Sequence, residues 1–220
     1  MSPSSSPEGS PISVRYNLVA AQSVERIAAL SDGVFAVAMT LLVLDLKAPA
    51  EAAVHGDAEL ARALLEIAPR LLVYAMSFLT LGIFWVGQQT QLNHLARADR
   101  DVAWCNLTFL FAVTLMPFST SLMAEFFSLR LALLLYWANI LLLGLLLLAS
   151  WRYVLRTKLL REDAPAGLAQ AMTRRILIAQ ALYAVGAALC VFGTGWSLGF
   201  IVLVQLNYAL APRISLLQRI

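Results

Sequence analysis

Long apolar runs alternate with short polar segments along most of the chain. A helix that crosses the hydrocarbon core of a bilayer needs about 20 predominantly apolar residues, within a range of about 17–25. The runs have about this length, so the pattern predicts an all-α integral membrane protein. Six spans are expected, near residues 28–46, 68–88, 102–123, 130–151, 175–192 and 195–211.

The last two expected spans are joined only by a tight glycine-containing turn within CVFGTGWSLGF, residues 190–200. Two full spans joined in this way form a hairpin across the bilayer. A shallower re-entrant pair fits the same residues, because irregular backbone is tolerated at membrane depth where protein buries it. We favour the hairpin, and the re-entrant pair remains the alternative.

The distribution of Lys and Arg predicts the orientation. With six spans, both termini share one side with the connections that follow the second and fourth spans. Cytoplasmic loops carry an excess of Lys and Arg, and this side has twelve of them against four on the other, so both termini are expected in the cytoplasm. The twelve are Arg15, Arg26, Arg97, Arg100, Arg152, Arg156, Lys158, Arg161, Arg174, Arg175, Arg213 and Arg219, and the four are Lys47, Arg62, Arg70 and Arg130.

Composition agrees with a membrane location and suggests the domain organisation. Hydrophobic residues make up 60% of the 220 residues and charged residues 13%, whereas about 25% of a soluble domain is charged. The opening segment MSPSSSPEGSPISV is rich in Ser and Pro and lacks the apolar region of a signal peptide. We expect a disordered cytoplasmic tail over residues 1–22, a six-helix transmembrane domain over 23–212 and a short cytoplasmic C-terminus over 213–220.

The patterns that usually carry catalysis or ligand binding are missing from the sequence. It has no glycine-rich phosphate loop, no His-containing triad, no carboxylates facing each other on one helix and no Cys/His cluster at metal-ligand spacing. The sequence therefore favours a protein that is not an enzyme. We predict no cofactor, no metal site and no nucleic-acid partner.

Polar residues distinguish the first span from the others. Ser31 and Asp32 lie near its beginning and Thr40 in its middle. An ionisable side chain within a membrane helix is costly, and it usually faces a bundle interior or a water-filled cavity where it has a function. The alternative is that Asp32 only caps or pairs with a group at the inner interface. Six residues of helix turn Arg26 away from Asp32, so a partner is expected on a neighbouring helix or subunit.

An apolar stripe follows Asp32 in the same span. Val37, Leu41 and Leu44 are separated by four and three residues, so they share one face of a helix. Asp32 lies about 7–8 Å before Val37 along the axis, at about 1.5 Å per residue. The spacing alone leaves open whether this face packs against another helix or lines a pathway.

The residues of the first span resemble those of a known protein family. The segment RIAALSDGVFAVAMTLLVLDLKAP, residues 26–49, resembles the first-helix signature of the bacterial branch of the transmembrane protein 175 family of potassium channels. Motif similarity covers residues 24–125, and the number of spans agrees over the whole chain. The matching residues are Arg26, Ser31, Asp32, Gly33, Val34, Phe35, Ala36, Thr40, Leu41, Leu42, Val43 and Leu44, with Trp85, Asn106, Leu107, Pro117, Phe118, Ser119 and Thr120 further on.

The resemblance implies a homotetramer in which the first helix of each chain lines a central pore. It implies a leak-type, weakly discriminating potassium channel in a bacterial inner membrane, whose partners are other copies of the chain, membrane lipids and the permeant ion. Apolar rings would form the constriction, and polar residues would support the pore helix near its cytoplasmic end. The implied ring positions are Val37, Leu41 and Leu44 with Thr40 beside them, and the implied supports are Arg26, Ser31 and Asp32.

The sequence departs from the family pattern at three places. Leu30 replaces the phenylalanine of a Phe-Ser-Asp triplet, and Val37 stands where relatives usually carry Ile or Leu. The shorter Val37 side chain is expected to widen the narrowest ring. Gln88 and Gln89 occupy the region where many relatives carry a histidine after the second-span tryptophan, so a role for that histidine is not expected here.

Two other functions remain open from the residues alone. In a proton-coupled secondary transporter, Asp32 would be the coupling carboxylate, although the two halves of the chain show no convincing repeat of the kind transporters often have. In a non-conducting membrane scaffold, the first span would be an ordinary packing helix. The family resemblance favours the channel.

Overall fold

The computed structural model describes residues 23–50 and 55–210 and is all-helical, as predicted. The predicted tail at 1–22 and C-terminal segment at 213–220 lie outside the described residues, as do Arg15, Arg213 and Arg219. The elements are α2 (Val24–Leu41), the 3₁₀ helix η1 (Leu42–Asp45), α3 (Asp57–Glu66), α4 (Ala68–Asn93), α5 (Arg100–Thr114), α6 (Met116–Glu125), α7 (Arg130–Arg156), α8 (Leu168–Ala188), the 3₁₀ helix η3 (Leu189–Val191) and α9 (Thr194–Leu210).

Several helical segments are long and apolar enough to cross a membrane. Within the described residues there are five, and the protein is therefore a multi-pass membrane protein. The sixth expected span corresponds to α9, which has 17 residues and is about 25 Å long, less than the roughly 30 Å of a hydrocarbon core. Six spans remain a prediction. The five are Val24–Leu44, Ala68–Asn93, Arg100–Glu125, Arg130–Arg156 and Leu168–Val191.

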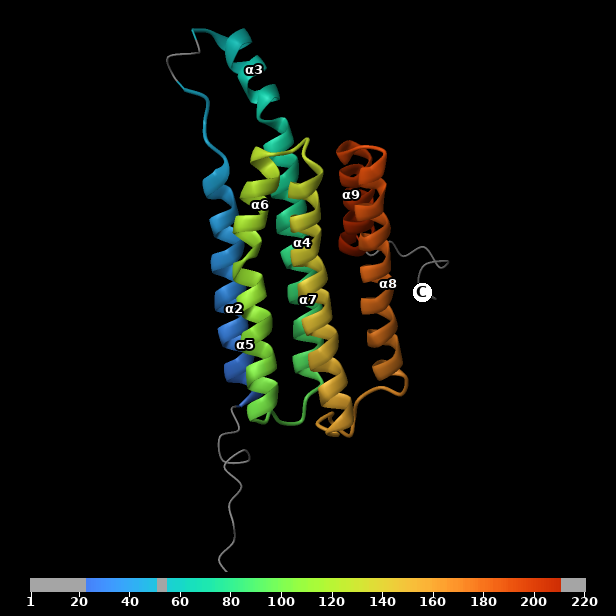
Figure 1. Cartoon of the computed structure of the whole chain (residues 1–220). Helices are drawn as coiled ribbons and strands as arrows, with labels where there is room; N and C mark the ends of the chain where they lie inside the picture. The colour runs from blue at the N-terminus through green and yellow to red at the C-terminus, as the bar shows by residue number, and fades with distance from the viewer. Residues whose placement is uncertain (1–22, 51–54, 211–220) are drawn as a thin grey trace, which may run out of the picture.

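The long helices lie side by side and alternate in direction (Figure 1). The beginning of α2 and the α4–α5 and α7–α8 connections lie together at the lower end of the view, whereas α3 and the α8–α9 turn lie at the upper end. Two backbone hydrogen bonds join the connections at the lower end: Ala96 N–H donates to Leu159 C=O at 2.9 Å, and Arg161 N–H donates to His94 C=O at 2.9 Å. The beginning of α2 and the two connections therefore share one end of the bundle, as the Lys and Arg distribution assumed, and the side of the C-terminus stays a prediction.

A buried polar network joins four helices in the upper half of the bundle. The Tyr136 hydroxyl lies 3.2 Å from Ser77 Oγ and 3.4 Å from Thr80 Oγ1. Thr120 donates to Ser77 at 2.7 Å, and the Gln205 amide donates to Thr80 at 2.6 Å. Hydrogen bonds between membrane helices each contribute about 0.6 kcal/mol on average. The network thus ties α9 to α4, α6 and α7.

The third expected span is a broken helix. α5 ends at Thr114 and α6 begins at Met116, with Pro117 in its first turn. The Asn139 amide from α7 inserts at the break. In the amide orientation that gives both its oxygen and its nitrogen a partner, the nitrogen donates to Ala112 C=O at 3.2 Å. The oxygen accepts from Met116 N–H at 3.2 Å and from Ser119 Oγ at 3.1 Å. Residues 112 and 116 would bond each other in a regular helix, so the side chain takes the place of one backbone hydrogen bond, and such an insertion bends a helix.

Asn139→Leu is expected to lower the free energy of unfolding by about 1–3 kcal/mol, because two buried backbone groups lose their partner. Thermal unfolding of the purified protein measures the effect. The matched control is Asn207→Leu, since Asn207 is exposed on α9 and its replacement should change stability by less than about 0.5 kcal/mol. Equal stability of the two variants would show that the Asn139 amide does not support the break.

Candidate functional site

One face of α2, continued by the first residue of η1, is buried against the rest of the protein. Its members recur at intervals of four, four, three and four residues, as one face of a helix requires. α2 packs here against α4 and α5, and the Phe35 ring lies 6.1 Å from the Phe109 ring, centroid to centroid. The members are Ile27, Ser31, Phe35, Ala38 and Leu42.

The opposite face of α2 and of the η1 turn that follows it is apolar and uncovered within the described chain. Val37 is 57% exposed, Leu41 43% and Leu44 69%. Thr40 is exposed beside them, and its hydroxyl donates back into the helix, to Ala36 C=O at 3.0 Å and Val37 C=O at 2.8 Å. The structure therefore places the four residues predicted for the constriction next to one another.

An apolar groove of about 440 Å³ runs beside this face, between α2 and the α5–α6 break. Leu30, Val37 and Leu41 line it from α2, and Thr114 and Pro117 line it from the broken helix. Leu30, which replaces the phenylalanine of the family triplet, is 48% exposed here. The groove places the break directly beside two of the predicted ring positions.

Ser31 is bound into a buried polar cluster with α4 and α5. The Ser31 hydroxyl donates to Ile27 C=O at 2.8 Å and lies 3.4 Å from Asn106 Oδ1. The Gln88 amide donates to Asn106 Oδ1 at 2.5 Å and to Ser31 Oγ at 3.2 Å. All three side chains are buried. Because each has partners on two other helices, the cluster holds the first half of α2 at a defined position.

Asp32 has hydrogen-bond partners on α4, whereas the sequence left open whether they lie on a neighbouring helix or on a neighbouring subunit. Trp85 Nε1 donates to Asp32 Oδ1 at 2.7 Å, and the Gln89 amide donates to the same oxygen at 2.5 Å. Both donors are neutral, so neither hydrogen bond is an ion pair. The Arg26 side chain is exposed, and no ion pair joins it to another residue of the described chain.

Trp85 and Gln89 were not assigned these roles by the sequence. Trp85 was named only among the residues that match the family motif, and Gln89 only in the region where many relatives carry a histidine. The available signal was their separation of four residues, which puts both side chains on one face of α4. That spacing is common on any helix, so it could not by itself indicate a shared partner on α2.

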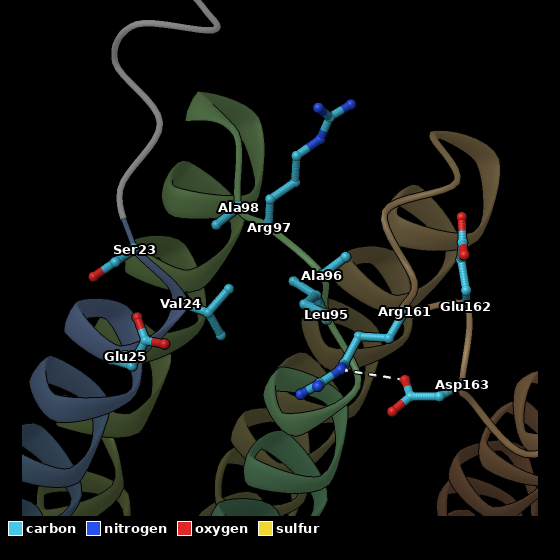
Figure 2. Close-up of a pocket in the computed structure, with 10 residues that line it drawn as sticks. All are labelled: Ser23, Val24, Glu25, Leu95, Ala96, Arg97, Ala98, Arg161, Glu162 and Asp163. Atoms are coloured by element: carbon cyan, nitrogen blue, oxygen red, sulfur yellow. Dashed lines mark ion pairs between the residues drawn. The ribbon is translucent and has the colours of Figure 1, made fainter.

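An open depression of about 760 Å³ lies at the end of the bundle where α2 begins (Figure 2). The α4–α5 and α7–α8 connections form its other walls. Arg161 extends across it and forms an ion pair with Asp163 at 3.3 Å, while Arg97 points outward. Glu25, on the first turn of α2, also lines it. The charges are mixed, so the depression has no marked preference for cations or anions.

The fold and the site define a multi-pass helical membrane protein whose first helix is held on one face and leaves an apolar face free. The sequence model of a family described as the endosomal/lysosomal potassium channel TMEM175 matches residues 26–117. This chain belongs to that family, which confirms the predicted resemblance. The family consists of ion channels, so the prediction that the protein is not an enzyme is also confirmed.

Bacterial relatives cover most of the chain. A potassium channel of Streptomyces collinus is 36% identical over 151 residues, which are 66% of this chain and 72% of that protein. A potassium channel of Chamaesiphon minutus is 31% identical over 189 residues, 84% of this chain and 93% of that protein. The crystal structure of a lysosomal potassium-selective channel TMEM175 homolog from Chamaesiphon minutus superposes with a TM-score of 0.73 at 29% identity, covering 86% of this chain and 98% of that one.

Proposed function

We propose that the protein is a potassium-selective, weakly discriminating cation channel in which α2 lines a central pore of a homotetramer. One observation carries the proposal. α2 is fixed on one face by apolar and polar contacts, yet Val37, Leu41 and Leu44 are left exposed on the other. The names of the bacterial relatives, which are potassium channels, supply the permeant ion.

Conduction past apolar rings is controlled by hydration. A narrow hydrophobic constriction excludes water and ions, and a slight widening lets a hydrated column form. Potassium holds its hydration shell less tightly than sodium, so partial dehydration at the ring costs potassium less. This favours potassium modestly and needs neither a cage of backbone carbonyls nor a cofactor or resident metal. The expected activity is a leak-type potassium conductance.

Val37 differs from the other two ring positions in the length of its side chain. Val37 is shorter than the Leu41 and Leu44 side chains, so its ring is wider than one built from Ile or Leu would be. Thr40 adds a polar atom beside the rings, but its hydroxyl hydrogen is directed to Ala36 and Val37 backbone oxygens. A threonine oxygen can then only accept, which suits a passing cation better than an anion.

Topology and location form part of the proposal. α9 completes a sixth span, and both termini lie in the cytoplasm with the α4–α5 and α7–α8 connections. Basic residues in those connections and at the adjoining end of α7 support this orientation in a bacterial inner membrane; they include Arg97, Arg161, Arg152 and Arg156. Ser31 and Asp32 then support the pore helix near its cytoplasmic end through α4 and α5. Arg26, exposed on the same end of α2, is assigned to that support by the family motif alone.

Asp32 is expected to concentrate cations at the inner approach to the pore. Asp32→Asn removes the charge but keeps an oxygen that accepts from Trp85 and Gln89, so the fold should be preserved. Potassium flux should fall by up to roughly tenfold at low ionic strength. The effect should shrink at high salt, because the screening length drops from about 30 Å at 0.01 M to about 3 Å at 1 M.

Flux into liposomes at several salt concentrations measures this effect. The control is Asp57→Asn, which makes the same change on α3, at the opposite end of the bundle (Figure 1). A loss of flux in Asp32→Asn that is equal at low and high salt would contradict the role in concentrating cations.

The function itself is tested by reconstituting the purified protein in liposomes and comparing potassium with sodium flux. The proposal expects unsaturated, electrogenic potassium flux that exceeds sodium flux. Equal, negligible flux of both ions through folded protein would rule out the channel. Saturable uptake driven by a proton gradient and abolished in Asp32→Asn would instead support a secondary transporter.

A further inference from the structure

A narrow apolar cavity of about 60 Å³ opens between α8 and the α4–α7 pair, on the side of the bundle away from α2. Ile83 and Phe84 from α4, Leu147 from α7, and Ile176 and Ala179 from α8 line it. Gly87 on α4 also lines the cavity, and its missing side chain leaves space opposite Leu147. This apolar part of the lining suits hydrocarbon.

Tyr183 and, about one turn before it on α8, Gln180 line the cavity beyond Arg175. The Gln180 amide packs against α7 where Gly144 has no side chain, because a Cβ at Gly144 would fall within 1.9 Å of Gln180 Nε2. Arg175 and Tyr183 are eight residues apart on α8, which corresponds to about 12 Å along the axis. The apolar space is therefore short, and an occupant that enters beside Arg175 fills it with only part of a chain.

A cation stands at the mouth of the cavity. The Arg175 guanidinium lies 5.6 Å from the centre of the Tyr208 ring, and both residues line the cavity. Arg175 is exposed, and no ion pair joins it to another residue of the described chain. It is the eighth residue of α8, about 10 Å from the start of that helix. An arginine at this depth extends toward the interface, where lipid phosphates lie.

We propose that this cavity is a binding site for an anionic phospholipid of the surrounding bilayer. The lipid phosphate pairs with Arg175, and the first part of one acyl chain lies between α8 and the α4–α7 pair. The end of the bundle that carries Arg175 is the basic one, and basic pockets between membrane helices on that side attract anionic headgroups. The lipid would thereby bridge the α8–α9 hairpin to the rest of the bundle. The site does not depend on what passes along α2.

Lipid binding is measured by native mass spectrometry of delipidated protein titrated with phosphatidylglycerol. Separate titrations with phosphatidylcholine and with glycerol phosphate, which has no acyl chains, distinguish the roles of net charge and hydrocarbon. The wild type should bind phosphatidylglycerol most tightly and glycerol phosphate not measurably. Arg175→Gln should weaken phosphatidylglycerol binding about fivefold, the loss expected for one arginine near the headgroups.

Matched variants separate this site from general attraction to basic residues. Arg174→Gln removes the neighbouring charge, which does not line the cavity, and should leave binding close to that of the wild type. Gly87→Leu fills the cavity and should weaken binding, whereas Gly199→Leu adds the same side chain where nothing lies within 4 Å and should not. Equal losses in Arg174→Gln and Arg175→Gln would overturn the proposal, as would unchanged binding in a folded Gly87→Leu protein.

Discussion

Leu41→Asn is expected to increase cation flux on the order of tenfold, which corresponds to a barrier lower by about 1.4 kcal/mol. In the proposed tetramer the substitution replaces a ring of isobutyl groups by a ring of amides. Amides hydrogen-bond to water, so the constriction stays wet at a width where leucines would exclude water. Discrimination between potassium and sodium should decline at the same time, because ions then pass with more of their hydration shell.

The matched control for this substitution is Leu142→Asn. Leu142 lies in the middle of α7 and is 38% exposed, close to the 43% of Leu41, so both variants place an amide on an exposed part of a membrane helix. Only Leu41→Asn should change the flux and the potassium-to-sodium ratio in liposomes. Unchanged flux and selectivity in Leu41→Asn, or equal changes in both variants, would show that Leu41 does not form the constriction.

Phe35→Ala is expected to lower the free energy of unfolding by about 3–5 kcal/mol, as is usual when a buried phenylalanine is truncated. Phe35 is 1% exposed. Its ring packs near Phe109, which in turn packs near Phe84, with centroid distances of 6.1 and 6.3 Å. The cavity left by truncation would lie between α2, α4 and α5, where α2 is fastened to the bundle.

Thermal unfolding of the purified protein measures this loss, and Val37→Ala is the control. Val37 lies two residues further along α2 but is 57% exposed, so its truncation should change stability by less than about 0.5 kcal/mol. The flux of Val37→Ala should nevertheless rise, because the substitution widens the proposed ring while it leaves the fold intact. Similar stability losses in the two variants would mean that both faces of α2 are packed in the assembled protein.

The break in the third span is a feature that the sequence predicted only in part. Pro117 lies within the expected span 102–123, and a proline inside a helix removes one backbone hydrogen bond. The sequence did not indicate that Asn139, on the next span, would insert its amide at the residues just before that proline. Such a contact depends on how α7 is rotated and shifted against α5, which local pattern does not contain.

The two faces of α2 were predictable to different degrees. The stripe of Val37, Leu41 and Leu44 follows from helical spacing, and the structure leaves all three exposed. The partners of Asp32 did not follow from spacing. Trp85 and Gln89 meet it across more than fifty residues of sequence, at distances of 2.7 and 2.5 Å, and only the packing of α4 against α2 creates that site.

The sequence by itself determined that the chain is an all-helical membrane protein, because backbone groups in hydrocarbon must be satisfied within each apolar segment. It also determined the family, through a long motif in the first span. Tertiary structure alone decided which side of α2 is held and which is free. In a bilayer, apolar residues are favourable on every face of a helix, so the pattern of apolar residues does not distinguish packed faces from lipid-exposed ones. Polar contacts of defined geometry, such as those of Ser31 with Gln88 and Asn106, make that choice.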